Sequence, residues 1–287
     1  MSRLRGIMLA ICASACALTG AGASAARPPA ERIVTLAPHL AELTFTAGAG
    51  KRIVGTVEYS DHPAEARSIP RVGDAFRVDL ERLIALTPDV VLAWHSGTPR
   101  ALIERIEGLG LRVETLETQR LADVATVLRT IGEIAGTEHE ADAAAAAFER
   151  DIEALRRAYS GRPKLRVFVQ IGEHPLYTVN GRQIMSELLE LCGGENVFAR
   201  LPELAPAVSI EAVIAADPEI IVVADDVTGE PLALWRKWRS IAAVRTRNVY
   251  SVEADDVSRA TTRLIDGARE LCRTLDTARA RRTRAAH

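Results

Sequence analysis

The chain has 287 residues, of which 48% are hydrophobic and 26% charged, a composition typical of a folded globular protein and not of a disordered one. Its 36 Lys and Arg residues against 38 Asp and Glu residues give a formal net charge of -2, which excludes nucleic acid as an expected partner, because phosphate binding needs a concentrated basic surface. At about 100–200 residues per domain, the length predicts two domains.

The first 25 residues have the layout of a secretory signal peptide. Two arginines precede a short apolar stretch at residues 6–18, and Ala23-Ser24-Ala25 offers a cleavage site of the A-x-A type. We therefore expect residues 1–25 to be removed and the mature protein to be secreted. The alternatives are an uncleaved membrane anchor and lipidation at Cys16, which lacks the usual Leu three residues before it.

Cleavage would leave 262 residues with a net charge of -4 and two of the four cysteines, Cys192 and Cys272. An even pair in an oxidising compartment is typical of a disulfide. The helical patterns at residues 186–191 and 268–275 indicate that such a bridge would join two helices of the C-terminal half. Two buried free thiols are the alternative.

Short β-branched runs alternate with helical patterns along the chain. Strands are predicted at residues 33–36, 53–56, 90–93, 113–116, 165–170 and 249–251, and helices from residue 41, at 79–85 and at 99–109. Such alternation is typical of βαβ units, in which helices cover a parallel sheet. The sequence therefore predicts an α/β fold.

An internal repeat relates the two halves. Residues 78–92 match residues 208–222 at an offset of 130, and each copy contains a helical pattern, a Pro and a buried strand pattern in the same order. Glu81 and Glu211 occupy equivalent places in the two copies. The repeat indicates two related lobes.

Residues 139–159 are rich in Ala, Glu and Arg and contain no Gly or Pro, which favours one uninterrupted helix. A helix of about 20 residues is about 30 Å long. We expect an N-terminal lobe at 31–136, a linking helix at 137–160 and a C-terminal lobe at 164–280. Two Rossmann-like lobes on such a strut would enclose a ligand cleft that opens and closes little.

Two features of the C-terminal half are predicted to face solvent. Trp235 and Trp238 fit a semi-exposed helix face, with the mouth of the cleft as the alternative position. The arginine-rich segment at residues 279–284 is expected to be a frayed tail.

Aromatic side chains stand where ligands of α/β sheets bind, beyond the carboxyl ends of the strands. Tyr59, Trp94 and Tyr177 occupy three such positions, although aromatics make up only 4% of the chain. Together they would form a flat apolar platform with polar edges, which suits a large ring-shaped ligand. The alternative is that each side chain merely plugs the end of its sheet.

Several motifs resemble those of the helical-backbone (class III) solute-binding proteins, and within them the periplasmic members that bind cobalamin (vitamin B12) for an ABC importer. The motifs are Ile33-Val-Thr-Leu-Ala-Pro38, Glu42, Tyr59-Ser-Asp-His-Pro63, Asp79-Leu-Glu81-Arg, Pro88-Asp-Val-Val-Leu-Ala-Trp94 and Cys192-Gly-Gly-Glu-Asn196. They span nearly all of the mature chain. The resemblance implies a periplasmic, monomeric binding protein with cobalamin as its transported ligand and no cofactor of its own.

The resemblance also implies roles for individual residues. Tyr59, Trp94 and Tyr177 match positions that hold the corrin ring, and Asp255 and Arg259 match polar contacts from the second lobe.

Cys192 and Cys272 match the family's disulfide, while Glu81 and Glu211 match carboxylates that dock onto arginines of the membrane permease. One carboxylate per lobe suits a permease dimer with two-fold symmetry. The alternative is that each Glu simply begins a helix, where negative charge is favourable.

The sequence departs from the cobalamin-binding pattern at Ala75 and Ala205, where those proteins carry aromatic residues. Phe76 lies next to the first position and could substitute for it. His39 could also approach the cobalt of a bound corrinoid. We therefore expect a ligand that is held more loosely or that differs in its nucleotide loop or upper ligand.

A rival interpretation uses histidines. His39, His62, His95 and His174 all follow predicted strands, and imidazole is a common metal ligand. They favour, as the alternative function, a protein of the same family that binds haem, a ferric siderophore or a metal ion. Their spacings match no local metal-binding motif. The sequence also lacks a nucleophile elbow, a zinc-protease helix and a phosphate loop, so we do not expect an enzyme.

Overall fold

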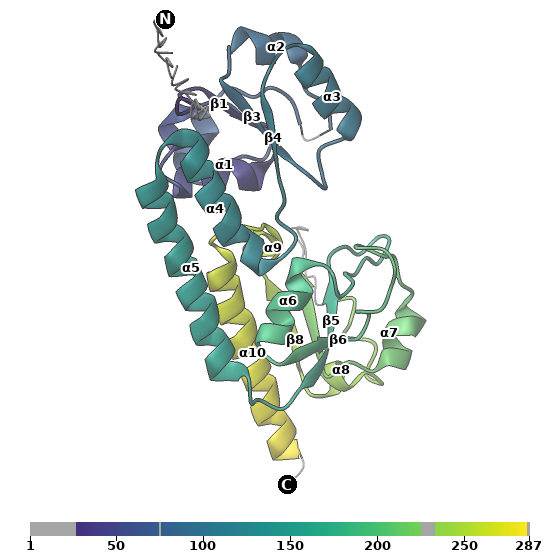
Figure 1. Ribbon diagram of the computed structural model, residues 1–287. Coiled ribbons are helices and arrows are strands. Elements are labelled where there is room, and N and C mark those ends of the chain that lie inside the picture. Colours follow the sequence, from purple (N-terminus) through teal and green to yellow (C-terminus); the bar gives the residue numbers. More distant parts are fainter. Residues whose placement is uncertain (1–26, 75, 225–232, 286–287) are drawn as a thin grey trace, which may run out of the picture.

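The computed structural model describes residues 27–74, 76–224 and 233–285, which form two α/β lobes (Figure 1). The predicted signal peptide, with Cys16, and Ala75 lie outside these described residues. Each lobe contains a parallel four-stranded sheet, with strand orders β2-β1-β3-β4 and β6-β5-β7-β8. The prediction of two α/β lobes is thus confirmed. Within the described ranges, no helix combines the length and the apolar character needed to cross a membrane.

The N-terminal lobe precedes the long helix α5. Its elements are β1 (Ile33–Thr35), α1 (Pro38–Thr46), the 3-10 helix η1 (Gly50–Arg52), β2 (Ile53–Gly55), η2 (Ala64–Ser68), α2 (Leu80–Ala85), β3 (Val90–Trp94), α3 (Arg100–Gly108), β4 (Val113–Leu116) and α4 (Leu121–Ala135). Helix α1 begins three residues earlier than predicted because proline is accepted at a first helical position.

The C-terminal lobe follows α5 (Glu138–Tyr159). Its elements are β5 (Leu165–Gln170), α6 (Ile184–Leu191), β6 (Gly194–Asn196), α7 (Ile210–Ala216), β7 (Ile220–Ala224), α8 (Ala242–Arg245), β8 (Val249–Val252), α9 (Ala254–Ser258) and α10 (Leu264–Ala285). The internal repeat corresponds to α2–β3 in one lobe and α7–β7 in the other, and β3 and β7 occupy the same place in their sheets.

Successive strand residues point to opposite faces of each sheet, so each sheet packs on two cores. Val90 and Leu92 of β3 face one core, whereas Val91 faces another that includes Leu83 of α2. In the C-terminal lobe, Val167 and Val169 of β5 face the first of these cores. Phe168 faces a separate outer core on the other side of the sheet. Each sheet is therefore buried on both faces, as parallel sheets generally are.

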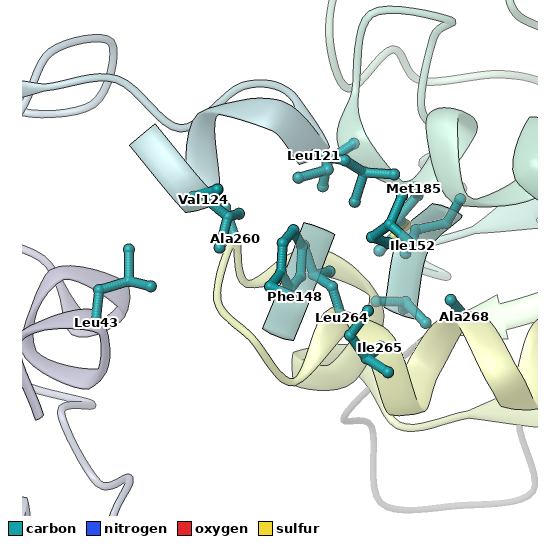
Figure 2. Close-up of a cluster of buried hydrophobic side chains, with 14 of the residues drawn as sticks. Leu43, Leu121, Val124, Phe148, Ile152, Met185, Ala260, Leu264, Ile265 and Ala268 are labelled. Atoms are coloured by element: carbon teal, nitrogen blue, oxygen red, sulfur yellow. The ribbon is translucent and has the colours of Figure 1, made fainter. Parts of the chain in front are cut away.

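The inner cores of the two lobes merge around three helices. Helix α5 carries the chain from one sheet to the other and contacts both α4 and α10 (Figure 1). Because burying one large apolar side chain contributes about 1.5–3 kcal/mol, this shared core holds the lobes together more firmly than one helix could. Figure 2 shows part of it: Leu43 of α1, Leu121 and Val124 of α4, Phe148 and Ile152 of α5, Met185 of α6, and Leu264, Ile265 and Ala268 of α10.

A disulfide joins Cys192, at the end of α6, to Cys272 of α10, as predicted. Both cysteines are fully buried, and their Cα atoms are 4.7 Å apart. The bridge therefore links α6 of the C-terminal lobe to α10, one of the three helices around which the cores of both lobes merge.

The prediction of a frayed arginine-rich tail was wrong, because these residues continue α10. Arg279 is only 8% exposed, and its Nη2 donates to the carbonyls of Cys192 at 2.7 Å and Gly193 at 3.1 Å. Carbonyls at the end of a helix attract a cation, and α6 ends at Cys192. Arg279 thus caps α6.

The prediction for Trp235 was also wrong. Its side chain is fully buried in the outer core of the C-terminal lobe and lies in a turn. The indole N–H donates to Oε1 of Gln170 at 2.8 Å, and the ring packs edge-on against Phe168. A hydrogen-bonded partner removes the cost of burying the indole nitrogen. Trp238 packs partly buried beside the same core.

Candidate functional site

The carboxyl edges of the two sheets face each other, and an ion pair crosses between them. Asp61 follows β2 in the N-terminal lobe, and Arg259 follows β8 and α9 in the C-terminal lobe. Nη1 of Arg259 donates to Oδ1 of Asp61 at 3.0 Å, and its Nε lies 2.7 Å from Asp255. Two predicted site residues, Asp255 and Arg259, are thus placed between the lobes.

The charge of Arg259 affects the protonation of its partner. Burial alone would raise the pKa of the Asp61 carboxyl, but the hydrogen bond from Arg259 and its positive charge outweigh this and lower that pKa. Asp61 therefore stays ionised, and the ion pair persists at neutral pH.

A second ion pair crosses between the lobes beside the first. Nε and Nη2 of Arg263 donate to the two carboxylate oxygens of Glu42 at 2.9 and 3.2 Å. Glu42 is only 2% exposed. The guanidinium of Arg263 also donates to Asp256 at 2.8 Å and lies 3.6 Å from Asp255.

Four residues of these ion pairs were not predicted as site residues: Glu42, Asp61, Asp256 and Arg263. A local signal for Asp256 and Arg263 exists, since the acidic pair at residues 255–256 is followed by arginines at residues 259 and 263, shortly after the last predicted strand. What the sequence does not show is the partner in the other lobe, about 200 residues away.

His39, Trp94 and Thr118 form a second group at this edge, from the ends of β1, β3 and β4. The rings of His39 and Trp94 meet edge to face with their centres 5.1 Å apart, and a hydrogen bond of 3.2 Å joins Nε2 of His39 to the Thr118 hydroxyl. Gly97 lies against the indole, where an added Cβ would come within 1.8 Å of the Trp94 ring. The three strand ends thus build one polar and aromatic corner.

The Trp94 indole nitrogen is buried and has no hydrogen-bond partner within the described part of the chain. Leaving such a donor unpaired costs free energy, and native proteins tolerate few examples. The indole nitrogen of Trp238, which packs on the outer core, is unpaired in the same way, so this cost alone assigns no binding role to Trp94.

Protonation of His39 is expected to destabilise the folded protein at acidic pH. Burial, followed by the positive charge of Arg259, lowers the pKa of His39 from 6.5 to about 4. The unfolded chain therefore takes up this proton as the pH falls below 6.5, whereas the folded chain takes it up only near pH 4. Stability attributable to His39 is then lost across this range, by about 3 kcal/mol in full.

The measurement is urea unfolding between pH 7 and pH 4, comparing the wild type with His39→Gln, whose amide can keep the bond to Thr118. The difference between the two unfolding free energies should change with pH in favour of the variant as the pH falls. Parallel pH curves for the two proteins would contradict a neutral, buried His39.

The other predicted aromatics are exposed. Tyr59 is 77% exposed, Phe76 72% and Tyr177 38%. Among the described residues, no ring contact joins any of the three to Trp94. Large apolar side chains that are exposed singly are common on protein surfaces, so exposure alone does not assign these three to a binding site. Ala205 is exposed as well and adds no ring.

The remaining predicted histidines are dispersed. His62, His95 and His174 are exposed, and His174 lies 3.5 Å from Glu173. Across the residues that the structure describes, no three His, Cys, Asp or Glu side chains are grouped so that they could hold a metal ion.

Glu81 and Glu211 are both exposed, each as the second residue of a helix. Asp79 and Ser209 cap these helices by accepting backbone N–H groups. The Glu211 backbone N–H and the Ser209 hydroxyl lower the pKa of the Glu211 carboxyl. Each lobe thus presents one carboxylate to solvent from an equivalent helix.

Residues 33–255 match the model of a family of periplasmic binding proteins. The chain belongs to the periplasmic binding protein family. Members of this family are transport components and not enzymes.

Family members of similar sequence share almost the full length of the chain. The vitamin B12-binding protein of Vibrio campbellii is 34% identical over 261 residues, covering 91% of this chain and 94% of that protein. The vitamin B12-binding protein of Vibrio parahaemolyticus is 33% identical, covering 90% and 94%.

Solved structures of the family show the same fold. The crystal structure of the periplasmic vitamin B12-binding protein of Vibrio cholerae superposes with a TM-score of 0.81 at 31% identity, covering 88% of this chain and 98% of that one. A periplasmic haem-binding protein of Vibrio cholerae gives a TM-score of 0.75 at 18% identity, covering 85% and 98%, and shares the fold alone.

Proposed function

We propose that this protein captures cobalamin or a related corrinoid in the periplasm and delivers it to the permease of an ABC importer. Relatives named for vitamin B12 binding, at 31–34% identity over about nine-tenths of the chain, support this ligand class. The observation that carries the proposal is the negative charge of the site between the lobes. This charge favours a corrinoid over haem, which proteins of the same fold bind.

Four carboxylates and two guanidinium groups meet between the lobes, which leaves an excess of two negative charges when all are ionised. Both arginines are already paired: Arg259 with Asp61 and Asp255, and Arg263 with Glu42 and Asp256. Haem carries two propionate carboxylates, which this site would repel. A corrin ring carries neutral amide groups at its edge, and these can donate to the same carboxylates.

The aromatic side chains supply the rest of the recognition. Trp94 stands at the inner corner, while Tyr59, Phe76 and Tyr177 leave apolar surface exposed. In this proposal they contact the faces and edges of the corrin ring, and Asp255 and Arg259 bind its amides. Apolar walls with a few fixed polar groups are typical of small-molecule sites.

Delivery is assigned to Glu81 and Glu211. In this proposal the two exposed carboxylates bind arginines on the two subunits of a permease dimer, so that each lobe meets one subunit. Residues 1–25 would direct the chain to the periplasm and be removed there.

The proposal is tested by titrating the purified protein with cyanocobalamin, cobinamide and haem while following tryptophan fluorescence. We expect both corrinoids to bind with micromolar or better affinity and to quench the fluorescence, and haem to bind more weakly. Trp94→Ala should reduce corrinoid affinity by about tenfold or more, since an aromatic contact and its buried area contribute at least about 1.4 kcal/mol.

Trp238→Ala is the matched control, because Trp238 packs on the outer core of the C-terminal lobe and should leave affinity unchanged. Haem binding tighter than corrinoid binding would refute the proposed ligand. Equal affinity of Trp94→Ala and the wild type would remove Trp94 from the site.

A further inference from the structure

Glu42 reaches from the first helix of the N-terminal lobe to the start of the last helix of the other lobe. Its carboxylate accepts two hydrogen bonds from Arg263, the residue immediately before α10. The two residues are 221 positions apart in the chain. This contact fixes α1 against the beginning of α10.

Glu187 makes the reciprocal contact. It lies in α6, the first helix of the C-terminal lobe, and its Oε2 accepts the backbone N–H of Leu121, the first residue of α4, at 2.8 Å. Its Oε1 lies 3.5 Å from Nη2 of Arg120. Here the C-terminal lobe holds the start of the last helix of the N-terminal lobe.

The two contacts are equivalent in the topology. Helices α1 and α6 each follow the first strand of their lobe, and α4 and α10 each follow its last strand, with α9 intervening before α10. The local sequences agree as well, since Glu-Leu recurs at 42–43 and 187–188, and Arg-Leu at 120–121 and 263–264. Each lobe therefore holds the other by the same pair of elements (Figure 1).

We propose that Glu42 and Glu187 form two reciprocal clasps that set the relative orientation of the lobes, and that the Glu42 clasp also positions the ligand-binding pair Asp255 and Arg259. The second statement rests on the proposed function, whereas the first does not. Glu42 acts through Arg263 and needs no contact with the ligand of its own, so it is a positioning residue.

The two clasps differ in burial and in what they connect. Glu42 is 2% exposed, and the guanidinium of Arg263 compensates its charge. The side chain of Glu187 is 25% exposed, accepts from a neutral backbone group and lies at 3.5 Å from the Arg120 guanidinium. A buried charge that loses its partner is strongly unfavourable, so the Glu42 clasp is the more sensitive of the two.

Only the Glu42 clasp extends to the proposed ligand site. Arg263 donates to Asp256 and lies 3.6 Å from Asp255, and Asp255 in turn pairs with Arg259 at 2.7 Å. Once Glu42 no longer holds Arg263, the guanidinium is free to turn toward Asp255 and Asp256. That movement would compete with Arg259 for Asp255 and disorder the pair.

The first test measures lobe orientation without any ligand. Spin labels on Glu107→Cys of α3 and Glu195→Cys of β6, both exposed and one per lobe, report the inter-lobe distance with the native disulfide kept intact. We expect one narrow distance distribution in the labelled parent, and a broader or shifted one after Glu42→Gln and after Glu187→Gln. Unchanged distributions in both variants would overturn the clasps.

The second test measures cobalamin affinity in the same variants. Glu42→Gln should weaken binding at least tenfold, and Glu187→Gln, the matched control, by no more than about threefold. In an Asp255→Asn background the effect of Glu42→Gln should largely disappear, because the connection through Asp255 is already broken. Equal losses for the two glutamates, or full additivity with Asp255→Asn, would overturn the positioning role.

A further variant guards against misfolding of Glu42→Gln. The double substitution Glu42→Leu with Arg263→Met fills the same space without burying a charge, and such replacements usually fold. Because no guanidinium remains to compete with Arg259 for Asp255, this variant should bind cobalamin more tightly than Glu42→Gln, and a loss as large as that of Glu42→Gln would refute the positioning role. If the wild type itself fails to bind cobalamin, the proposed function falls, while the distance measurement still decides on the clasps.

Discussion

Reversing the two carboxylates proposed to dock onto the permease, by Glu81→Arg together with Glu211→Arg, is expected to abolish corrinoid uptake while leaving corrinoid binding unchanged. Both side chains are exposed on helices α2 and α7, and neither helix contributes a residue to the inter-lobe ion pairs described above. Like charges placed opposite each other across an interface cost several kcal/mol, and two such contacts would exceed the affinity of a typical transient complex. Corrinoid-dependent growth of a strain lacking its own binding protein measures the uptake, and titration of the purified variant measures the binding.

The matched control reverses Glu107 and Glu195, which are also exposed, one in each lobe, but lie on other elements. It changes the net charge by the same amount and should support normal uptake. Thermal unfolding checks that the docking variant is folded, since Arg at the start of a helix costs up to about 1 kcal/mol. Normal uptake by the docking variant would refute the assignment of Glu81 and Glu211.

Strands such as β3 and β5 could be predicted from the sequence because parallel strands buried on both faces are continuous apolar runs. Strand β6, with the sequence Gly-Glu-Asn, has no such run and was not predicted. Residues 90–93 were predicted as a strand and form β3 with one further residue, and residues 165–170 form β5. The repeat predicted two related lobes for the same reason, since a helix start, a Pro and an apolar run are all local signals.

Side chains that are buried by distant partners could not be predicted in this way. Arg279 was expected in solvent because its neighbours in sequence are arginines, yet the carbonyls at the end of α6 bind it. Trp235 was expected at the surface because residues 234–238 are amphipathic, yet Gln170 of β5 satisfies its indole nitrogen. In both cases a hydrogen-bond acceptor from another element offsets the free-energy cost of burying the polar group.

In the candidate site, too, local features could be predicted from the sequence and contacts between distant residues could not. Trp94 was placed by a local signal, the end of an apolar strand, and it lies in the corner with His39. The ion pairs of Asp61 with Arg259 and of Glu42 with Arg263 join residues 198 and 221 positions apart, and no local pattern encodes such a pairing. A sequence can therefore indicate which edge of the sheet carries a site before it indicates how the lobes are joined there.

Removing the bridge between Cys192 and Cys272 is expected to lower the free energy of unfolding by about 4.5 kcal/mol, the entropic value for a closed loop of about 80 residues. The effect should extend beyond the C-terminal lobe, because α10 packs in the core that both lobes share.

Denaturant unfolding of the double variant Cys192→Ala with Cys272→Ala, beside the oxidised and the reduced wild type, measures the loss. The reduced wild type is the control for the missing sulfur atoms. If both comparisons give less than about 1 kcal/mol, the bridge does not constrain the unfolded chain as argued. If the loss is large and both lobes unfold in one transition, the helices shared between the lobes make the protein a single cooperative unit.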